Sequence, residues 1–457
     1  MKHNDNNVED ITISYIGGGS RGWAWKLMAD LAREKDISGE VRLYDIDRKA
    51  AQDNKIIGNR AGGNFRYTDS ASLEEALTGA DFVIISILPG TFDEMESDVH
   101  YPEKYGIYQS VGDTAGPGGI VRALRTIPMF VEIAQGIRAC CPEAWVINYT
   151  NPMALCVRAL YEAFPAIKAF GCCHEVFGTQ NVLCRVVKEE GLAEQVERHE
   201  LTINPVGVNH FTWITKAYYR DIDLFPVYQK YIERNAAGIQ EGEANWMNRF
   251  FTSKELVKFD LFQKFGAIAA AGDRHLAEFC PGNWYLKEPE TARRWGFDLT
   301  PVSWRKKDLE ERLEKSAKLV SGEMKFEKEE SGEEGVHQIK ALLGLGNMVT
   351  NVNLPNRGQI PNLPIGTIVE TNAIFSGDSV VPQMAGCIPA QILNLTMPAV
   401  CNQEVVLEAA LKKDIDLALC AIMTDRLSDR LSGADAREML LQMLRNTKES
   451  LPGWKIS

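Results

Sequence analysis

The sequence predicts an α/β protein in which a doubly wound parallel sheet is followed by a region of mixed α and β structure. Up to about residue 200, short apolar runs rich in β-branched residues alternate with helical stretches, as in consecutive βαβ units. Beyond it the pattern changes, because residues 201–219 alternate like an antiparallel strand pair and residues 390–448 show helical spacing. We therefore predict two domains, residues 1–200 and 201–457.

Composition and charge narrow the class of protein. The chain has 457 residues, of which 45% are hydrophobic and 25% charged, as is ordinary for a soluble globular protein. Its net charge of −12 argues against a nucleic-acid surface, and the lack of any apolar run of roughly 18 residues argues against a membrane span. The polar N-terminus has no signal-peptide core, and the ten cysteines have no regular spacing. We expect a reduced, cytoplasmic enzyme.

The first strand, turn and helix carry a dinucleotide-binding pattern. The apolar run 11–16 is followed at once by Gly17-Gly18-Gly19-Ser20-Arg21-Gly22, and a helix is predicted from residue 23 to residue 34. Glycines at this spacing permit the tight turn, the approach of a pyrophosphate and close helix–strand packing. The next predicted strand ends at Asp45, which would accept hydrogen bonds from the adenosine ribose. The alternative is a glycine-rich turn in another α/β fold.

The alternation of strands and helices continues along the predicted first domain. Further elements are expected at 72–78 (helix), 80–87 (strand), 121–140 (helix), 144–152 (strand), 153–164 (helix) and 166–170 (strand). Asn148 and Asn151 fall at the C-terminal end of one strand, where ligands bind in open α/β sheets. The glycine-rich loop within 101–119 is either functional or no more than an exposed turn.

A thiol, an imidazole and a carboxylate follow one another after the strand 166–170. These are Cys173, His174 and Glu175, and a second imidazole, His210, lies in the middle of the predicted strand pair. A thiolate and an imidazole together can hold a divalent metal. The alternatives are a buried small apolar residue for Cys173 and a hydrogen-bonded core histidine for His210.

The second predicted domain has less regular signals. Residues 225–265, 306–318 and 336–343 have helical patterns, whereas residues around 368–370 read as a strand. Residues 351–358, NVNLPNRG, are predicted to form a loop.

Six segments carry a resemblance to a known family. In chain order, GGGS, GGIVRALRTIP, INYTNP, CHEV, GVNHF and NLPNRGQIPNLP resemble glycoside hydrolase family 4, from about residue 10 to about residue 440. The tetrapeptide Cys173-His174-Glu175-Val176 resembles that of the family's α-galacturonidases. The resemblance implies a lactate/malate dehydrogenase-like architecture, a homodimer or homotetramer, and dependence on NAD and on Mn²⁺ or another divalent metal.

The resemblance also implies an unusual route of hydrolysis that does without the common pair of carboxylates. NAD oxidises the sugar at C3, a base removes the C2 proton, the C1 leaving group departs, water adds, and the ketone is reduced again. The metal stabilises the developing negative charge as a Lewis acid. The residues expected to bind NAD are Gly17, Gly18, Gly19, Ser20, Gly22, Asp45 and Asn148.

Other residues match the family's site with the following implied roles. Cys173 and His210 are the expected metal ligands, and His174 is the expected general acid, or else a hydrogen-bonding partner of another site residue. Asp273 is the expected C2 base, although its cationic neighbours Arg274 and His275 would lower its pKa and make it a poorer base. Asn151 is expected to bind sugar hydroxyls.

A uronic acid substrate requires a cation for its carboxylate. Arg274 and Arg357, both in predicted loops, are the candidates, and a solvated surface charge is the alternative for each. Glu175 would repel such a substrate, so we expect it to orient an arginine or to bind a hydroxyl.

The predicted activity is therefore the hydrolysis of α-galacturonides. α-Galactosidase or α-glucosidase activity within the same family is the first alternative. A lactate/malate-type NAD-dependent dehydrogenase and a non-catalytic nucleotide sensor are the others, and both leave Cys173 and His210 without a role.

Overall fold

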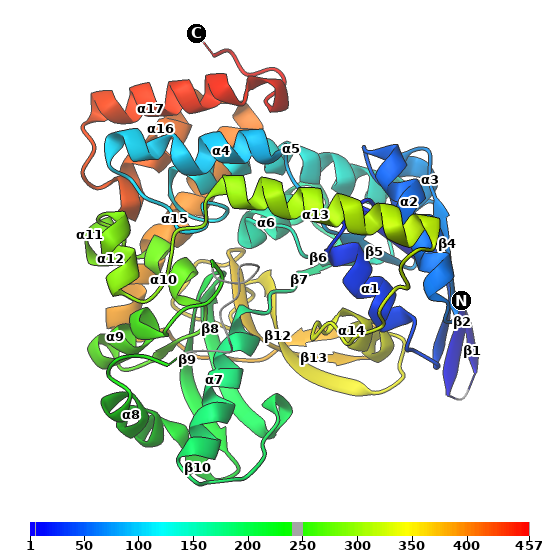
Figure 1. The fold of residues 1–457 in the computed structure, drawn as a ribbon, viewed down its shortest axis with the longest axis horizontal. Coiled ribbons are helices and arrows are strands. Elements are labelled where there is room, and N and C mark those ends of the chain that lie inside the picture. The colour runs from blue at the N-terminus through cyan, green and yellow to red at the C-terminus, as the bar shows by residue number, and fades with distance from the viewer. Residues whose placement is uncertain (5, 240–249, 457) are drawn as a thin grey trace.

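The computed structural model describes residues 1–4, 6–239 and 250–456, and it confirms the predicted fold class. The described strands form one sheet of ten strands and a second of four. The larger sheet begins with the blue N-terminal strands at the right of Figure 1, and the smaller sheet lies below the centre of that view.

Six parallel strands of the larger sheet have the order of a dinucleotide-binding fold. These are β2 (Asn7–Ile16), β3 (Ile37–Tyr44), β4 (Phe65–Asp69), β5 (Phe82–Ile85), β6 (Trp145–Asn148) and β7 (Lys168–Gly171), and the short β1 (Lys2–Asn4) pairs with β2. Their order across the sheet is β7-β6-β5-β2-β3-β4. The chain therefore leaves β2 in one direction and returns beside it as β5, and the crevice at this reversal is where such sheets bind ligands.

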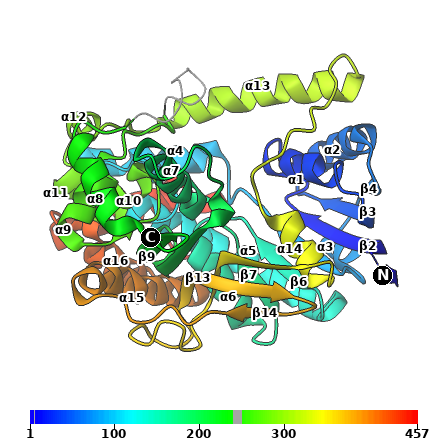
Figure 2. The ribbon, with the colours of Figure 1, turned by 90° about the horizontal axis from the view of Figure 1, so that it is seen from below.

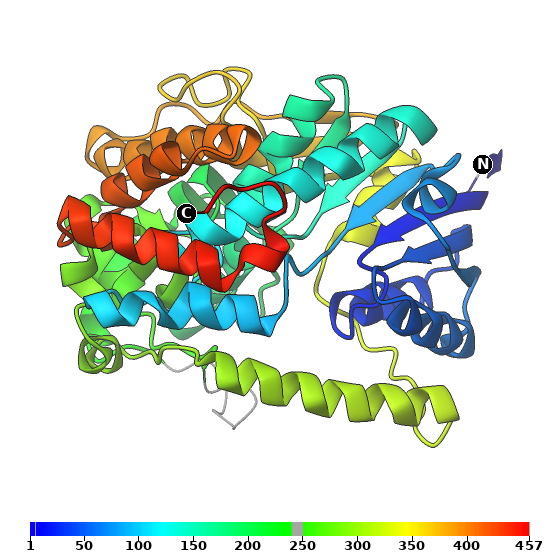
Figure 3. The ribbon, with the colours of Figure 1, turned by 90° about the horizontal axis from the view of Figure 1, so that it is seen from above.

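Helices cover both faces of this sheet, which explains why its strands are nearly continuous apolar runs. One face carries α1 (Trp23–Leu31), α2 (Arg48–Ala61) and α14 (Gly335–Leu342), and the other carries α3 (Leu73–Leu77), α5 (Gly116–Cys140) and α6 (Met153–Ala163). Figure 3 shows the two layers on opposite sides of the blue strands. The helix predicted to begin at residue 121 begins at Gly116, so it includes the last part of the predicted loop 101–119.

Three strands from the second half of the chain extend the same sheet. β12 (Asn347–Pro355), β13 (Ile368–Ser376) and β14 (Val380–Pro382) continue it antiparallel beyond β7. The prediction of a loop at 351–358 was wrong for residues 351–355, because the asparagines that suggested a turn are buried in the strand and bond to a carboxylate. A boundary at residue 200 stays a prediction, since later segments complete the first sheet.

The smaller sheet holds the predicted antiparallel pair. β8 (Leu201–Val208) and β9 (Phe211–Tyr219) form a hairpin whose turn is Asn209-His210. The other members are β10 (Ile222–Asp223) and β11 (Ile268–Ala269), and α7 (Glu175–Glu189) and α8 (Leu224–Arg234) pack on the sheet. The helical prediction for 225–265 is confirmed by α8 and α9 (Leu256–Phe265) but was wrong for residues 235–239 and 250–255, which are not helical. Its part at 240–249 lies outside the described residues.

The remaining helices form one layer, apart from a single long helix, the bridge, which connects two parts of the molecule. The layer contains α4 (Phe92–His100), α10 (Asp273–Phe279), α11 (Gly282–Tyr285), α12 (Pro289–Arg294), α15 (Ala390–Lys412), α16 (Ile415–Thr424) and α17 (Gly433–Asn446). Single 3-10 turns lie at Pro102–Tyr105, Arg198–Glu200, Arg426–Ser428 and Lys448–Ser450. The bridge is α13 (Val302–Ser321), which runs along the edge of the molecule in Figure 2 from α4 to α2. None of the described helices has both the length and the apolarity needed to cross a membrane.

Candidate active site

The glycine-rich turn lies at the reversal point of the large sheet. The amide groups of Gly17 and Gly18 each donate to the carbonyl oxygen of Tyr44 at 2.9 Å. Gly17 has φ +92°, and a Cβ atom there would lie 2.0 Å from the carbonyl oxygen of Ser86, directly after β5. Only glycine fits this turn, because any side chain would collide with the backbone of the next strand.

Polar side chains stabilise this turn through hydrogen bonds to its backbone. Asp45 accepts the amide N–H of Gly19 at 2.9 Å, and burial raises the pKa of its carboxyl group. Ser20 caps the start of α1, since its Oγ accepts the amide N–H of Trp23 at 3.1 Å. Asn54, which the sequence gave no reason to single out, donates to the carbonyl oxygens of residues 18 and 20 at 2.7 and 3.0 Å.

The two asparagines after β6 have different surroundings. Asn148 is fully buried, and its side chain bonds to both backbone groups of Thr150, so it shapes the turn. Asn151 donates to Asp113 Oδ2 at 3.4 Å, and its own Oδ1 is buried without a partner among the described residues. Only Asn151 has a polar atom left for a ligand.

His174 lies at the N-cap of α7, between the nucleotide crevice and the carboxylate of Glu333. Its ring stacks on Trp23, the first residue of α1, with 5.9 Å between ring centroids. Its Nδ1 lies 3.4 Å from Glu333 Oε1, and the interaction with Glu333 raises the pKa of the imidazole. Half of its side chain remains exposed, so it can reach a ligand.

Glu175 connects His174 to a second group of residues. One carboxylate oxygen accepts the amide N–H of Gly272 at 2.6 Å. The other lies 4.0 Å from His174 Nε2 and 3.7 Å from His275 Nε2. Burial opposes its ionisation, but the imidazoles of His275 and His210 outweigh burial and lower the pKa of Glu175 to about 2. Glu175 is thus a fixed anion between two imidazoles.

Asp113, His210 and His275 form a compact cluster at the centre of the site. Their candidate ligand atoms all lie within 4.8 Å of one another. The two imidazoles stack with 4.1 Å between centroids, and Thr114 Oγ1 lies 3.1 Å from His210 Nδ1. Burial, and then His275, lowers the pKa of His210 to about 3, and burial lowers that of His275. Burial opposes the ionisation of Asp113, but the two imidazoles hold its pKa below its ordinary value.

This donor set fits a divalent metal. Neutral imidazoles and an ionised carboxylate are the protonation states in which these side chains bind metals, and Mn²⁺, Fe²⁺ and Zn²⁺ all accept such ligands. Of the predicted ligands, His210 belongs to the cluster and Cys173 does not. Asp113 and His275 are members of the cluster that the sequence did not single out as candidate ligands. The only signal in the sequence was the position of Asp113 in the glycine-rich loop.

Cys173 lies beside the cluster, next to a buried polar network. Burial raises the pKa of its thiol, and its side chain interacts with that of Asn209 in the hairpin turn. The same asparagine donates to Glu370, a carboxylate with 1% of its surface exposed. The side-chain donors that converge on Glu370 are Thr212, Asn351, Asn353 and Asn209, at 2.5, 3.0, 3.3 and 3.4 Å. Glu370 therefore fixes the turn that carries His210.

The structure does not bring Asp273 into the cluster. Its Oδ1 accepts the amide N–H of Lys258 at 3.0 Å in the first turn of α9. Burial, and then the neighbouring Glu255, raises the pKa of Asp273 to about 8. Its Oδ2 is buried without a partner among the described residues.

The two predicted arginines have contrasting environments. Arg274 is 7% exposed and donates to the Ser110 carbonyl oxygen at 3.2 Å and to Thr300 Oγ1 at 2.5 Å. Its guanidinium lies 5.0 Å from the ring centroid of Phe251. Arg357 is exposed in the loop after β12, and its side chain has no ion pair with a described residue.

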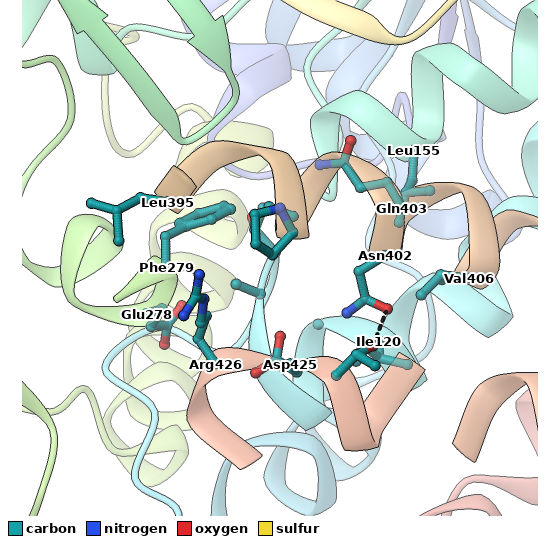
Figure 4. A pocket seen from close by; sticks show the side chains of 16 residues that line it. Ile120, Leu155, Glu278, Phe279, Leu395, Asn402, Gln403, Val406, Asp425 and Arg426 are labelled. Atoms are coloured by element: carbon teal, nitrogen blue, oxygen red, sulfur yellow. Dashed lines mark hydrogen bonds between the residues drawn. The ribbon is translucent and has the colours of Figure 1, made fainter. Parts of the chain in front are cut away.

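A small cavity of about 50 Å³ adjoins the cluster through Thr114 (Figure 4). Helices α15 and α16 and the start of α5 enclose it, and Asn402, Asp425 and Glu278 contribute polar groups. Glu278 holds the loop before the cluster, because its Oε1 accepts the amide N–H groups of Val111 and Gly112 at 2.7 and 2.9 Å.

Comparison with known proteins places this arrangement in a family. Residues 12–189 match the model of the family 4 glycosyl hydrolases, and residues 205–428 match that of their C-terminal domain. The α-galacturonidase of Thermoanaerobacterium saccharolyticum is 61% identical over 464 residues, covering 100% of both chains. The crystal structure of lplD from Bacillus subtilis, 51% identical, superimposes with a TM-score of 0.92 over 96% of this chain and 100% of that one.

A more distant structure shares the fold. The 6-phospho-β-glucosidase of Thermotoga maritima, determined with manganese, NAD⁺ and glucose-6-phosphate, is 23% identical and has a TM-score of 0.76 over 96% of this chain and 99% of that one. Both family models match in chain order and together cover most of the sequence. The chain belongs to family 4 of the glycosyl hydrolases.

Proposed function

We propose that this glycosidase hydrolyses α-galacturonides with NAD and a divalent metal as cofactors. The observation that carries the proposal is the position of Glu175, which lies between His174 at the nucleotide crevice and His275 in the Asp113–His210–His275 cluster. A sugar between the two groups would meet a proton donor and a metal-binding set at once. The name and full-length identity of the Thermoanaerobacterium saccharolyticum relative support the galacturonide over neutral sugars.

The shape of the glycine-rich turn and the donor atoms of the cluster support the assignment of these residues to NAD and the metal. The turn at Gly17–Gly22 leaves no room for a side chain at Gly17 and faces the crevice, as a pyrophosphate site requires. The cluster and the neighbouring Cys173 supply nitrogen, oxygen and sulfur donors for the metal. When bound, NAD would exchange a hydride with C3 and the metal would act as a Lewis acid. The Thermotoga maritima enzyme was determined with manganese and NAD⁺, which supports both assignments.

His174 would protonate the leaving oxygen. Its side chain is half exposed beside Trp23, and its interaction with Glu333 favours the protonated imidazole. Asn151 would bind a sugar hydroxyl through its unpartnered Oδ1. Asp45 would face the ribose, and Asn148 would act by holding the turn before Asn151.

Two residues compete for the role of C2 base. Asp273 is the one indicated by family resemblance, but it is directed to the start of α9. His275 lies in the cluster, and its Nδ1 is buried without a partner in the described part of the chain. Asp273→Asn and His275→Asn separate the two, because loss of the base stops exchange of the C2 hydrogen with solvent while sugar binding persists. We expect Asp273→Asn to keep the exchange, and its loss in this variant would restore the aspartate; His275→Asn would also remove a member of the metal-binding cluster, so its Mn²⁺ affinity must be measured beside the exchange.

The assembly and the location of the protein are further proposals. We expect a homodimer or homotetramer in the cytoplasm, without a nucleic-acid or membrane partner. Light scattering of the purified protein measures the first directly, and a monomeric mass would contradict it.

The activity itself is tested with matched p-nitrophenyl α-galacturonide and α-galactoside, in the presence of NAD, Mn²⁺ and a thiol reductant. We expect nitrophenol only from the galacturonide, with loss of activity on adding a chelator and in Cys173→Ala. Cys401→Ala, which removes an exposed thiol, is the matched control and keeps full activity. Release from the galactoside would retain the mechanism and change the substrate. NADH accumulating from a hydroxy acid, with no nitrophenol, would indicate a dehydrogenase.

A further inference from the structure

Three guanidinium groups from three helices surround the single carboxylate of Asp113. Arg122 comes from α5, Arg274 from α10 and Arg305 from the first turn of α13. Each of them interacts electrostatically with Asp113. Arg122 and Arg274 are buried and Arg305 is partly exposed, and Glu175 and Glu278 act on Arg274 in addition to Asp113.

Arg305 is the one of these three guanidinium groups that has no hydrogen-bond acceptor among the described residues. Arg122 donates to the carbonyl oxygen of Asn151 at 3.2 Å, and Arg274 has the two acceptors described above. Arg305 has neither an ion pair nor a hydrogen bond with any residue in the described ranges, and its Nε is buried and unpartnered. A buried donor of a charged group that makes no hydrogen bond is costly, so the buried Nε of the partly exposed Arg305 indicates a missing partner.

The carboxylates nearest to Arg305 are already engaged. Asp308 accepts from Arg312 at 2.7 Å, and Glu278 accepts the two amide groups of the loop at 111–112. Both contribute to the electrostatics of Arg305, yet neither lies within ion-pair distance.

Phe251 holds Arg305 and Arg274 side by side. The two guanidiniums lie 6.0 and 5.0 Å from its ring centroid. The two side chains come from different helices, α10 and α13, and meet at this one ring. Two guanidinium groups at one aromatic ring present a set of donors that suits a planar carboxylate.

We infer that Arg305, together with Arg274, binds the C6 carboxylate of the galacturonosyl group and so makes the site specific for uronic acids. The inference rests on the proposed function and adds a specificity residue from the bridging helix α13. It also replaces the exposed Arg357 as the second carboxylate ligand. A neutral galactoside would leave Arg305 unpaired, which explains discrimination by the enzyme against a sugar of the same shape.

The test compares Arg305→Gln with wild type on both p-nitrophenyl glycosides, with NAD and Mn²⁺ present. We expect kcat/KM for the galacturonide to fall at least 100-fold, mainly through KM, and the galactoside to release no nitrophenol with either protein. Arg305→Lys keeps the charge without the planar pair of donors, and it should restore part of the galacturonide activity. Lys306→Gln is the matched control, because Lys306 pairs with Asp93 and Glu96 outside the site.

Binding provides a readout apart from turnover. Galacturonate should raise the unfolding temperature of wild type and of Lys306→Gln, and it should fail to do so for Arg305→Gln, whose unfolding temperature without ligand checks its folding. If wild type prefers the galacturonide and Arg305→Gln keeps that preference within threefold, the inference is overturned and the proposed function stands. If wild type itself shows no preference, the proposed function fails and the inference with it.

Discussion

The two sides of the crevice are built in different ways. The nucleotide side is made by one short stretch, in which the turn at Gly17–Gly22 is held by Asp45, 26 residues from Gly19. The opposite side gathers Asp113, His210 and His275 from a loop, a hairpin and a helix, and Arg305 from a fourth segment. One side depends on backbone conformation, and the other on side chains brought together by the whole fold.

The difference predicts where each side is vulnerable. A backbone-built turn fails when a side chain is added, because its shape leaves no space. A side-chain cluster fails when one polar partner is removed, because the others are then buried without a bond. Substitutions on the two sides therefore separate the two kinds of construction.

The largest effect is expected from Gly17→Ala. The positive φ and the contact of the new Cβ with Ser86 should together destabilise the protein by roughly 3–5 kcal/mol and abolish NAD binding. Gly178→Ala is the matched control, because nothing lies within 4 Å of a Cβ in this helical position, and it should stabilise by about 0.5–1 kcal/mol. Urea unfolding and NAD titration measure both. An unchanged NAD affinity in Gly17→Ala would refute the backbone account of this side.

A smaller effect is expected from Glu370→Gln on the opposite side. Four side-chain donors converge on this carboxylate, and an amide would turn an NH₂ group toward some of them. The expected loss is about 3 kcal/mol, with weaker Mn²⁺ binding because Asn209 adjoins His210. Manganese binding is read from the electron paramagnetic resonance of the free ion. Glu404→Gln, at an exposed pair with Arg158, should change stability by less than about 0.5 kcal/mol. Equal losses in the two variants would contradict the role of the network.

The change in the free energy of unfolding that arises from the ionisation of Asp425 should be smaller still. This residue ties the start of α5 to the cavity wall by accepting the amide N–H of Gly116 at 3.2 Å, and burial raises its pKa to about 6. The folded state holds the proton more tightly than the unfolded chain, so the stabilisation is fully present below about pH 4 and lost as the pH rises through 6. Asp425→Asn should remove a pH-dependent loss on the order of 2 kcal/mol between pH 4 and pH 7.

Thermal unfolding across this pH range checks the prediction. The profile of Asp425→Asn should be flatter than that of wild type, whereas Asp429→Asn, at an exposed neighbouring position, should follow wild type. Parallel profiles for wild type and Asp425→Asn would show that this carboxyl group does not couple the loop to pH.

The sequence was sufficient to predict the nucleotide side of the crevice, because its residues lie close together along the chain. Gly17, Gly19, Gly22 and Asp45 could be recognised because their spacing along the chain is also their relation in space. The strands β2, β3, β5, β6 and β7 and the helices α1, α3, α5 and α6 followed from their apolar patterns for the same reason, whereas β4, α2, α4 and α7 were not predicted.

The other side could not be derived in this way. Thr114 contacts His210 across 96 positions of the chain, and Glu370 bonds to Thr212 across 158. No periodicity encodes such contacts. Asn351 and Asn353 suggested a loop, because a buried asparagine and a turn asparagine differ only in partners that the sequence does not display.

The most direct test of the whole account is hydrolysis of an α-galacturonide in D₂O. If a base of this site removes the C2 proton before the leaving group departs, the galacturonate released must carry deuterium at C2, and the bound NAD must be oxidised at the end of each turnover. Mass spectrometry and NMR of the product measure this in one experiment. Galacturonate without deuterium at C2 would mean direct displacement at C1, and the roles proposed for the crevice and the cluster would then be wrong.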